Sequence, residues 1–326
     1  MTMHRRTFLR LMAGASAAFP AWSRAAFAET YPSRPVHVIV GLAPGGGVDI
    51  VARLMGQWLS SHFGQSFVIE NRPGAGTNIA TEVVVNAPAD GYTLLQASTP
   101  NAINASLYRH MPFDYMRDIA PVGGIVRSAL VMVVSPSFPA KTVPEFITYA
   151  KANPGKISMG SAGIGTPLHV AGELFAMMTG ISMVHIPYKG STPALTDLLG
   201  GQVQVVFSDT GGSNGFIAAG KLHALAVTAA TRLPTLPDVP SISEFVPGYE
   251  ASIWQGMGAP KGTPPAIIDA LNREVDAGLA DPALAARLTA SGYTTFAGTP
   301  ADFADFVAAE TLKWAKVIKF AKIAPA

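Results

Sequence analysis

The most distinctive chemistry in this 326-residue chain lies in a glycine-rich turn between a predicted strand and a predicted helix. The turn, Gly41 to Asp49, reads GLAPGGGVD. The β-branched stretch 36–40 precedes it, and apolar residues recur at helical spacing over 50–59. Three consecutive glycines expose backbone N–H groups at a helix N-terminus, where the helix dipole favours an anion. The turn lacks both the Gly-Lys-Ser/Thr of a P-loop and the G-x-G-x-x-G spacing of a dinucleotide site. We predict an anion site; the alternative is a tight turn that Asp49 caps.

A second strand, glycine loop and helix repeat the same plan. Strand 157–159 leads into Gly160–Gly165, and Thr166 with Pro167 is typical of a helix start. His169 lies one turn into this helix, where it either contacts a ligand or serves the structure alone. Asp209 comes after an apolar run and is predicted at a strand's carboxyl end, facing the crevice or capping a helix. Two amide-rich loops that face each other favour binding.

The patterns expected of an enzyme are missing. Ser161 does not form a nucleophile elbow, because the residue two positions before it is not glycine. The seven histidines are scattered, and the zinc motif H-E-x-x-H does not occur. We therefore expect a binding protein rather than an enzyme, with no cofactor and no metal.

The first 28 residues read as an export signal. A basic start, a short apolar stretch and Ala26-Phe27-Ala28 have the order of a cleaved signal peptide. The order Arg5-Arg6-x-Phe8-Leu9 resembles a twin-arginine signal, with ordinary Sec export as the alternative. Removing residues 1–28 takes away four arginines and no acid, so the formal charge changes from +2 to −2. This balance gives no reason to expect nucleic-acid binding. The absence of cysteine excludes disulfides and a lipoprotein anchor.

Strands alternate with helices along the rest of the chain, which predicts an α/β fold with a largely parallel sheet. In such sheets the ligand crevice lies beyond the carboxyl ends of the strands. Both glycine loops, Thr77 and Ser98 would then open onto one rim. The predicted strands are 36–40, 66–70, 93–97, 129–135, 157–159, 183–186, 203–207, 225–228 and 253–259, with helices between them and from Pro264, Pro282 and Pro300.

Eight ordered motifs resemble the Bug family, the TctC-type solute receptors of tripartite tricarboxylate transporters. They span almost the whole chain after the signal: Pro44-Gly45-Gly46-Gly47-x-Asp49, Asn71-Arg72-Pro73-Gly74-Ala75-Gly76, Asp90-Gly91-Tyr92-Thr93-Leu94, Gly160-Ser161-x-Gly163-x-Gly165-Thr166-x-x-His169, His185-x-Pro187-Tyr188-Lys189-Gly190, Asp197-Leu198-Leu199-Gly200-Gly201-Gln202-Val203, Ala219-Gly220-Lys221-Leu222 and Leu236-Pro237-Asp238-Val239-Pro240.

The resemblance implies a two-domain periplasmic binding protein of the type II fold, a hinged trap that closes over a small carboxylate. We place one domain at 30–130 plus 250–326 and the other at 131–249. The family pattern assigns the ligand to the first glycine loop and the facing domain, and strand-end geometry adds Thr77 and Ser98. The predicted ligand-binding residues are Ala43, Gly45, Gly46, Asp49, Thr77, Ser98, Ser161, Gly163, Thr166, His169 and Asp209.

The resemblance implies one of two functions. The first is a periplasmic receptor that delivers a carboxylate to the membrane permease subunits of a tripartite transporter. The second is a receptor that reports its ligand to a membrane signalling partner without transport. The chain departs from the family pattern at Asn78-Ile79-Ala80 and at Asp209-Thr210-Gly211-Gly212, positions that bear on which ligand it takes.

Export gives the first testable prediction. We expect cleavage after Ala28, leaving Glu29 at the N-terminus of periplasmic protein, because Ala26-Phe27-Ala28 matches an A-x-A signal. N-terminal sequencing checks this, and an intact Met1 on exported protein would contradict it. On the twin-arginine route, Arg5→Lys combined with Arg6→Lys blocks export while expression continues.

Overall fold

The computed structural model describes residues 31–323, so the predicted signal peptide and its cleavage site lie outside the described residues. From Arg34 onward the described chain forms one compact unit. One mixed sheet runs through it in the order β2-β1-β3-β9-β4-β7-β5-β6, with β10 and β8 also paired to β4. The strands are β1 (Val36–Val40), β2 (Phe67–Asn71), β3 (Thr93–Ser98), β4 (Ile119–Val134), β5 (Ser158–Ser161), β6 (Val184–Pro187), β7 (Val205–Asp209), β8 (His223–Val227), β9 (Ser252–Pro260) and β10 (Thr294–Thr295).

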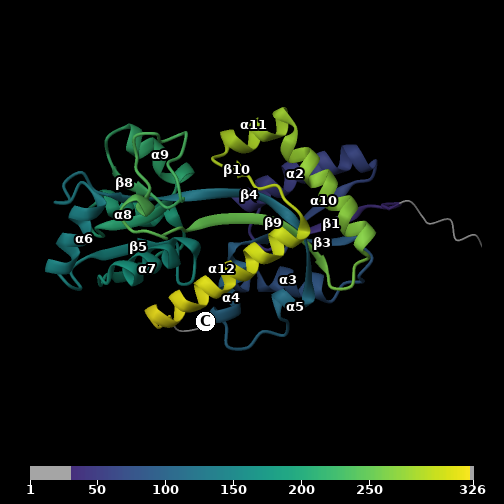
Figure 1. Ribbon diagram of the computed structural model, residues 1–326, viewed down its shortest axis with the longest axis horizontal. Coiled ribbons are helices and arrows are strands. Elements are labelled where there is room, and N and C mark those ends of the chain that lie inside the picture. Colours follow the sequence, from purple (N-terminus) through teal and green to yellow (C-terminus); the bar gives the residue numbers. More distant parts are fainter. Residues whose placement is uncertain (1–30, 324–326) are drawn as a thin grey trace, which may run out of the picture. The chain divides into compact units, whose positions relative to one another are not determined.

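Helices cover the sheet in two groups, on either side of the region where β4 and β9 run (Figure 1). The helices are α2 (Gly47–Phe63), α3 (Asn78–Val85), α4 (Thr99–Leu107), α5 (Tyr115–Asp118), α6 (Val143–Ala152), α7 (Pro167–Thr179), α8 (Ser191–Leu199), α9 (Thr210–Ala218), α10 (Pro265–Ala280), α11 (Pro282–Ala290) and α12 (Pro300–Ala321), with short 3₁₀ turns η1 (Ala75–Thr77) and η2 (Ile242–Glu244).

The strand β4 belongs to both halves of the sheet. Its first part pairs antiparallel with β9 and β10, and residues 130–134 pair antiparallel with β7 and β8. We call the part built on β1, β2, β3 and β9 the first lobe, and the part built on β5 to β8 the second lobe. The sequence predicted only 129–135 as strand here. Pro121, Gly123 and Gly124 interrupt the apolar strand pattern in the first part of β4, so the sequence there does not predict a strand. The pairing with β9 shifts register at the same residues.

Each lobe contains parallel strands that lead into helices. In the first lobe β1 pairs parallel with β2 and β3, and in the second β5 pairs parallel with β6 and β7. Most residues of the inner strands are buried because helices cover both faces of the sheet, which explains their largely unbroken apolar runs. The α/β class predicted from the sequence is confirmed, but the sheet is mixed rather than largely parallel, because β4 and β9 pair antiparallel with their neighbours.

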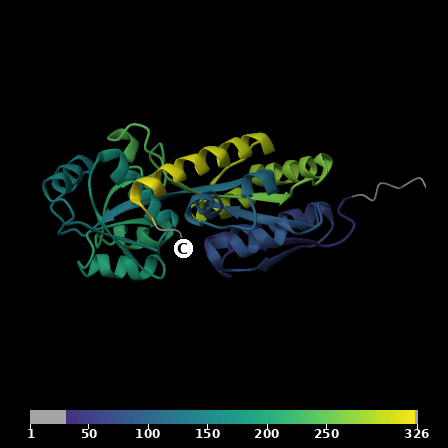
Figure 2. The same ribbon diagram turned by 90° about the horizontal axis from the view of Figure 1, so that it is seen from below.

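The last helix, α12, links the lobes (yellow in Figures 1 and 2). It packs against α4 of the first lobe, against β4 and against α7 of the second. Trp314 and Phe303 on this helix are almost fully buried, and Phe303 packs edge-on against Trp254 of β9. A long amphipathic helix buried over both lobes is stabilised mainly by this apolar face.

Thr228, directly after β8, joins the two strands that pass between the lobes. Its buried hydroxyl accepts a hydrogen bond from the Leu130 N–H of β4 at 2.7 Å and donates to the Ala251 carbonyl, next to β9, at 2.6 Å. Its backbone also bonds both residues. The Thr228 side chain thus bonds both strands that connect the lobes, and it does so at the same point along them.

We expect Thr228→Val to lower the free energy of unfolding by about 2–4 kcal/mol. Valine keeps the shape, but the Leu130 N–H and Ala251 carbonyl lose their hydroxyl partner in a buried place. Urea denaturation measures the change. The matched control is Thr196→Val, because the exposed Thr196 hydroxyl bonds only its own helix. Equal stability of the two variants would contradict this role.

Candidate functional site

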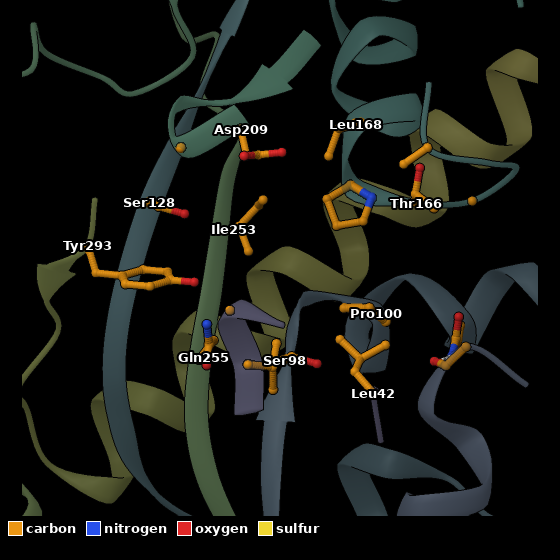
Figure 3. Close-up of a pocket in the computed structure, with 18 of the residues that line it drawn as sticks. Leu42, Ser98, Pro100, Ser128, Thr166, Leu168, Asp209, Ile253, Gln255 and Tyr293 are labelled. Carbon is orange, nitrogen blue, oxygen red and sulfur yellow. Dashed lines mark hydrogen bonds between the residues drawn. The ribbon is translucent and has the colours of Figure 1, made fainter. Parts of the chain in front are cut away.

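A cavity of about 580 Å³ lies between the two lobes. Figure 3 shows side chains from both lobes directed into it, with Asp209, Leu168 and Thr166 on one side and Ser98, Pro100 and Leu42 on the other. Its remaining walls come from β4, β9 and the segment after α11, represented by Ser128, Gln255 and Tyr293. Such a volume suits a small organic molecule.

Four helices begin at the wall of this cavity. Gly47 and Val48 start α2, Ser98 and Pro100 flank the start of α4, Thr166 and Pro167 start α7, and Asp209 with Thr210 starts α9. Each of these helices comes after the carboxyl end of a parallel strand. Their first-turn N–H groups and dipoles therefore favour an anion in the cavity without any cationic side chain.

The two helices of the second lobe have side-chain caps. The Asp209 carboxylate accepts a hydrogen bond from the Gly212 N–H at 2.7 Å and caps α9. The Thr166 hydroxyl accepts from the His169 N–H at 3.4 Å and donates to the Gly163 carbonyl at 2.8 Å. The Thr166 hydroxyl hydrogen and one Asp209 oxygen are thus already in use.

The start of α4 in the first lobe lacks a complete side-chain cap of the kind seen at α7 and α9. The Ser98 N–H donates to the Asn101 side-chain oxygen at 2.8 Å. The Ser98 hydroxyl lies opposite the Asn101 N–H, as in a capping box, but makes no hydrogen bond of full geometry, although the residue is 1% exposed. Figure 3 shows this hydroxyl directed toward the cavity. A buried hydroxyl without a partner is costly, so its presence beside a cavity indicates a group that a ligand completes.

A row of polar side chains forms one wall. Gln96 donates to the side-chain oxygen of Gln255 at 3.2 Å, and the Gln255 amide faces the Tyr293 hydroxyl (Figure 3). Burial raises the pKa of Tyr293, and the Asp209 charge adds to this effect while the Gln255 hydrogen bond opposes it. Tyr293 therefore stays a neutral phenol. Its hydroxyl lies against Gly47, where a Cβ would overlap it.

The other walls are mostly apolar. Leu42, Leu107, Ile164, Leu168 and Ile253 line them, and Asp209 is the only ionisable carboxylate among the described lining residues. That lining includes no lysine, arginine or histidine. Within residues 31–323 no cluster of histidine and acidic side chains is suited to hold a metal ion.

Three of the eleven predicted ligand-binding residues line the cavity: Ser98, Thr166 and Asp209. The other eight are not in its lining, although sequence neighbours of several of them are, such as Leu42, Gly47, Gly76 and Gly165. These eight, whose contact with a ligand stays a prediction, are Ala43, Gly45, Gly46, Asp49, Thr77, Ser161, Gly163 and His169.

Asp49 is occupied inside its own loop. Its carboxylate is 2% exposed and accepts hydrogen bonds from Arg53 at 2.8 Å, the Gly45 N–H at 2.9 Å and Asn71 at 2.9 Å. The Arg53 hydrogen bond is the main reason that the Asp49 pKa falls to about 2. The helix cap is Gly46 rather than Asp49, which lies in the first turn of α2 and holds the glycine loop to it.

Thr77 and His169 are also held by protein groups. Thr77 is buried in a left-handed backbone conformation, accepts a hydrogen bond from Asn101 at 3.4 Å, and packs on Gly41, where a Cβ would overlap it. His169 is 3% exposed, and its Nδ1 accepts from the Gly165 N–H at 3.0 Å.

Sequence reasoning missed Gln255, Ser128 and Tyr293. Gln255 is a polar residue inside the apolar predicted strand 253–259, and that contrast could have identified it as a site residue. Ser128 lies one position before the predicted strand 129–135. Tyr293 comes after α11 and reaches the cavity only through the packing of the last helices.

Known proteins of one receptor family are similar to this chain along most of its length. The family model of the "Tripartite tricarboxylate transporter family receptor", TctC, matches residues 51–323. The chain is 37% identical over 295 residues to the protein BugT of Bordetella pertussis, covering 90% of each chain.

Solved structures agree. The R. palustris protein Rpa4515, solved with adipate, is 40% identical with a TM-score of 0.78 and coverage of 91% of this chain and 100% of that one. MatC from Rhodopseudomonas palustris, solved with malate, is 29% identical with a TM-score of 0.73 and coverage of 88% and 100%. This family is one of receptors and not of enzymes. The chain therefore belongs to the TctC family of tripartite tricarboxylate transporter receptors, which includes the Bug proteins.

Proposed function

We propose that this receptor captures a small carboxylate between its lobes in the periplasm and delivers it to the permease subunits of a tripartite transporter. Four helix N-termini around one cavity, with the unpartnered Ser98 hydroxyl among them, are the observation that supports the ligand class most directly. Neutral donors at helix N-termini can hold an anion without a cationic side chain. The relatives solved with adipate and malate point to the same class.

We place the carboxylate on the first-lobe side, between Ser98 and the start of α2. The second-lobe side is less suitable because the Asp209 charge faces the cavity and the Thr166 hydroxyl is already bonded. The hydrocarbon part of the ligand would lie against Leu107, Ile164 and Leu168. The predicted loop residues Ala43, Gly45 and Gly46 belong to this proposal as neighbours of the lining residues.

We also propose that the domains are 30–130 with 250–326, and 131–249, and that they close about β4 and β9. Contacts across the cavity support closure: a Cβ at Gly165 would overlap Leu107 of α4, and one at Gly292 would lie 3.2 Å from the Thr210 hydroxyl. Cleavage after Ala28 completes the proposal. No helix in residues 31–323 is long and apolar enough to cross a membrane.

A sensing receptor without transport is the second candidate. The same closure could present a new surface to a membrane signalling protein, and the cavity does not distinguish the two. Deleting the gene separates them: a transport receptor is needed for uptake of the labelled ligand, whereas a sensor is needed only for the transcriptional response to it.

The ligand class is tested by thermal shift with adipate, malate, citrate, benzoate and glutamate. We expect at least one carboxylate to raise the melting temperature, because a ligand that binds the folded state stabilises it by mass action. The matching amides or alcohols should have no effect. Stabilisation by the neutral analogues alone would contradict an anion site.

Ser98→Ala separates binding from stability. We expect about a tenfold loss of affinity for the carboxylate found in that screen, since one charge-assisted hydrogen bond is lost. We expect the ligand-free protein to lose no more than about 1 kcal/mol of stability, because Ser98 is the N-cap of α4 but its hydroxyl makes no full hydrogen bond there. Calorimetry and urea denaturation measure the two effects.

The control for that experiment is Ser61→Ala, which removes an exposed hydroxyl bonded within α2. Unchanged affinity in Ser98→Ala would remove the start of α4 from the site.

A further inference from the structure

Two histidines that do not line the cavity lie directly behind one of its walls. His169 of α7 and His185 of β6 stack face to face, with ring centroids 3.5 Å apart and planes 11° from parallel. The wall in front of them is the loop from Ser161 to Thr166, whose Ala162, Ile164 and Gly165 line the cavity. The pair is thus placed to control that loop.

Each ring holds one end of the loop. The Nδ1 atom of His169 accepts a hydrogen bond from the Gly165 N–H at 3.0 Å. The Nε2 atom of His185 lies 2.6 Å from the Ser161 hydroxyl, which in turn accepts from the Gly163 N–H at 3.1 Å. The His169 hydrogen bond depends on a neutral ring, because a protonated Nδ1 can no longer accept from a backbone N–H.

The surroundings oppose a charge on His185 and orient His169. Burial and then the neighbouring His169 lower the His185 pKa to about 4. From α7 the Glu173 carboxylate lies 3.5 Å from Nε2 of His169, which favours the proton on that atom and leaves Nδ1 to accept from Gly165. From β5 the Ser161 hydroxyl contacts His185, and beyond β6 the Tyr188 hydroxyl donates to Asp197 of α8.

We propose that the stacked His169–His185 pair is a positioning device for the ligand-binding loop: Nδ1 of His169 holds its Gly165 end, and Nε2 of His185 holds its Ser161 end. This inference rests on the proposed carboxylate site. It gives His169 a role behind the cavity wall, in place of the ligand contact suggested by its position in the sequence.

Nuclear magnetic resonance of the ligand-free protein tests the geometry. Imidazole ¹⁵N spectra should show His169 with a bare Nδ1 and a proton on Nε2 at pH 7, and His185 neutral until the pH approaches about 4. The Gly165 amide should be protected from hydrogen exchange over the same range. A proton on Nδ1 of His169 at pH 7, or an unprotected Gly165 amide, would overturn the proposal.

A pair of variants then tests the positioning, with adipate as the probe in calorimetry. His169→Leu removes the acceptor of the Gly165 N–H, and we expect about a tenfold loss of affinity by loss of one hydrogen bond. His169→Asn keeps an oxygen acceptor near the position of Nδ1, so its affinity should remain within about threefold of wild type.

His223→Gln is the control, because this ring contacts the Lys141 carbonyl away from the cavity. Wild-type affinity in His169→Leu would contradict the positioning role, as would an equal loss of affinity in His169→Leu and His169→Asn. If adipate does not bind wild type at any pH, the ligand assignment fails, and the resonance experiment alone decides the role of the histidine pair.

Discussion

Helix N-termini directed at a single cavity are the feature on which the rest of this structure depends. A parallel strand followed at once by a helix places first-turn N–H groups beyond its carboxyl end, and each lobe does this twice at the cavity wall. The arrangement that results favours an anion and is fixed by the backbone. It needs no lysine or arginine, and the described lining contains neither. An anion can therefore be held by groups that the fold itself positions.

The groups that shape the loops are distinct from those that face the cavity. Asp49, ionised at any ordinary pH, ties its glycine loop to Arg53 and Asn71. Behind the opposite loop, His169 accepts from Gly165. These residues are buried and have protein partners, whereas Ser98 is buried and its hydroxyl has none. Unpartnered buried atoms also occur on residues that do not line the cavity, Gln96 and Trp254 for example, but among the described lining residues the unpartnered buried atom is the Ser98 hydroxyl.

The two lobes are connected by a pair of strands that one side chain joins, and by a helix that packs on both. The long strand β4 continues from one lobe to the other, β9 runs beside it, and Thr228 joins both. The helix α12 packs on both lobes. Because Thr228 bonds both strands, the closure proposed above would proceed by bending of β4 and β9 together.

Local signals in the sequence were sufficient for most of the elements, the α/β class and the family. Strand 36–40 matches β1, and the helix starts at Thr166 and Thr299 carry the expected side-chain caps, because such patterns depend on neighbours a few residues away. The same signals did not distinguish the residues that line the cavity from the residues that only hold the lining loops in place. His169 and Asp49 have suitable chemistry, and each is bonded to residues four positions away. Only packing brings their distant neighbours, His185 and Asn71, into contact with them. Tyr293 and Gln255 meet across the cavity wall because distant segments fold together, so only the tertiary structure decided which polar groups remain free for a ligand.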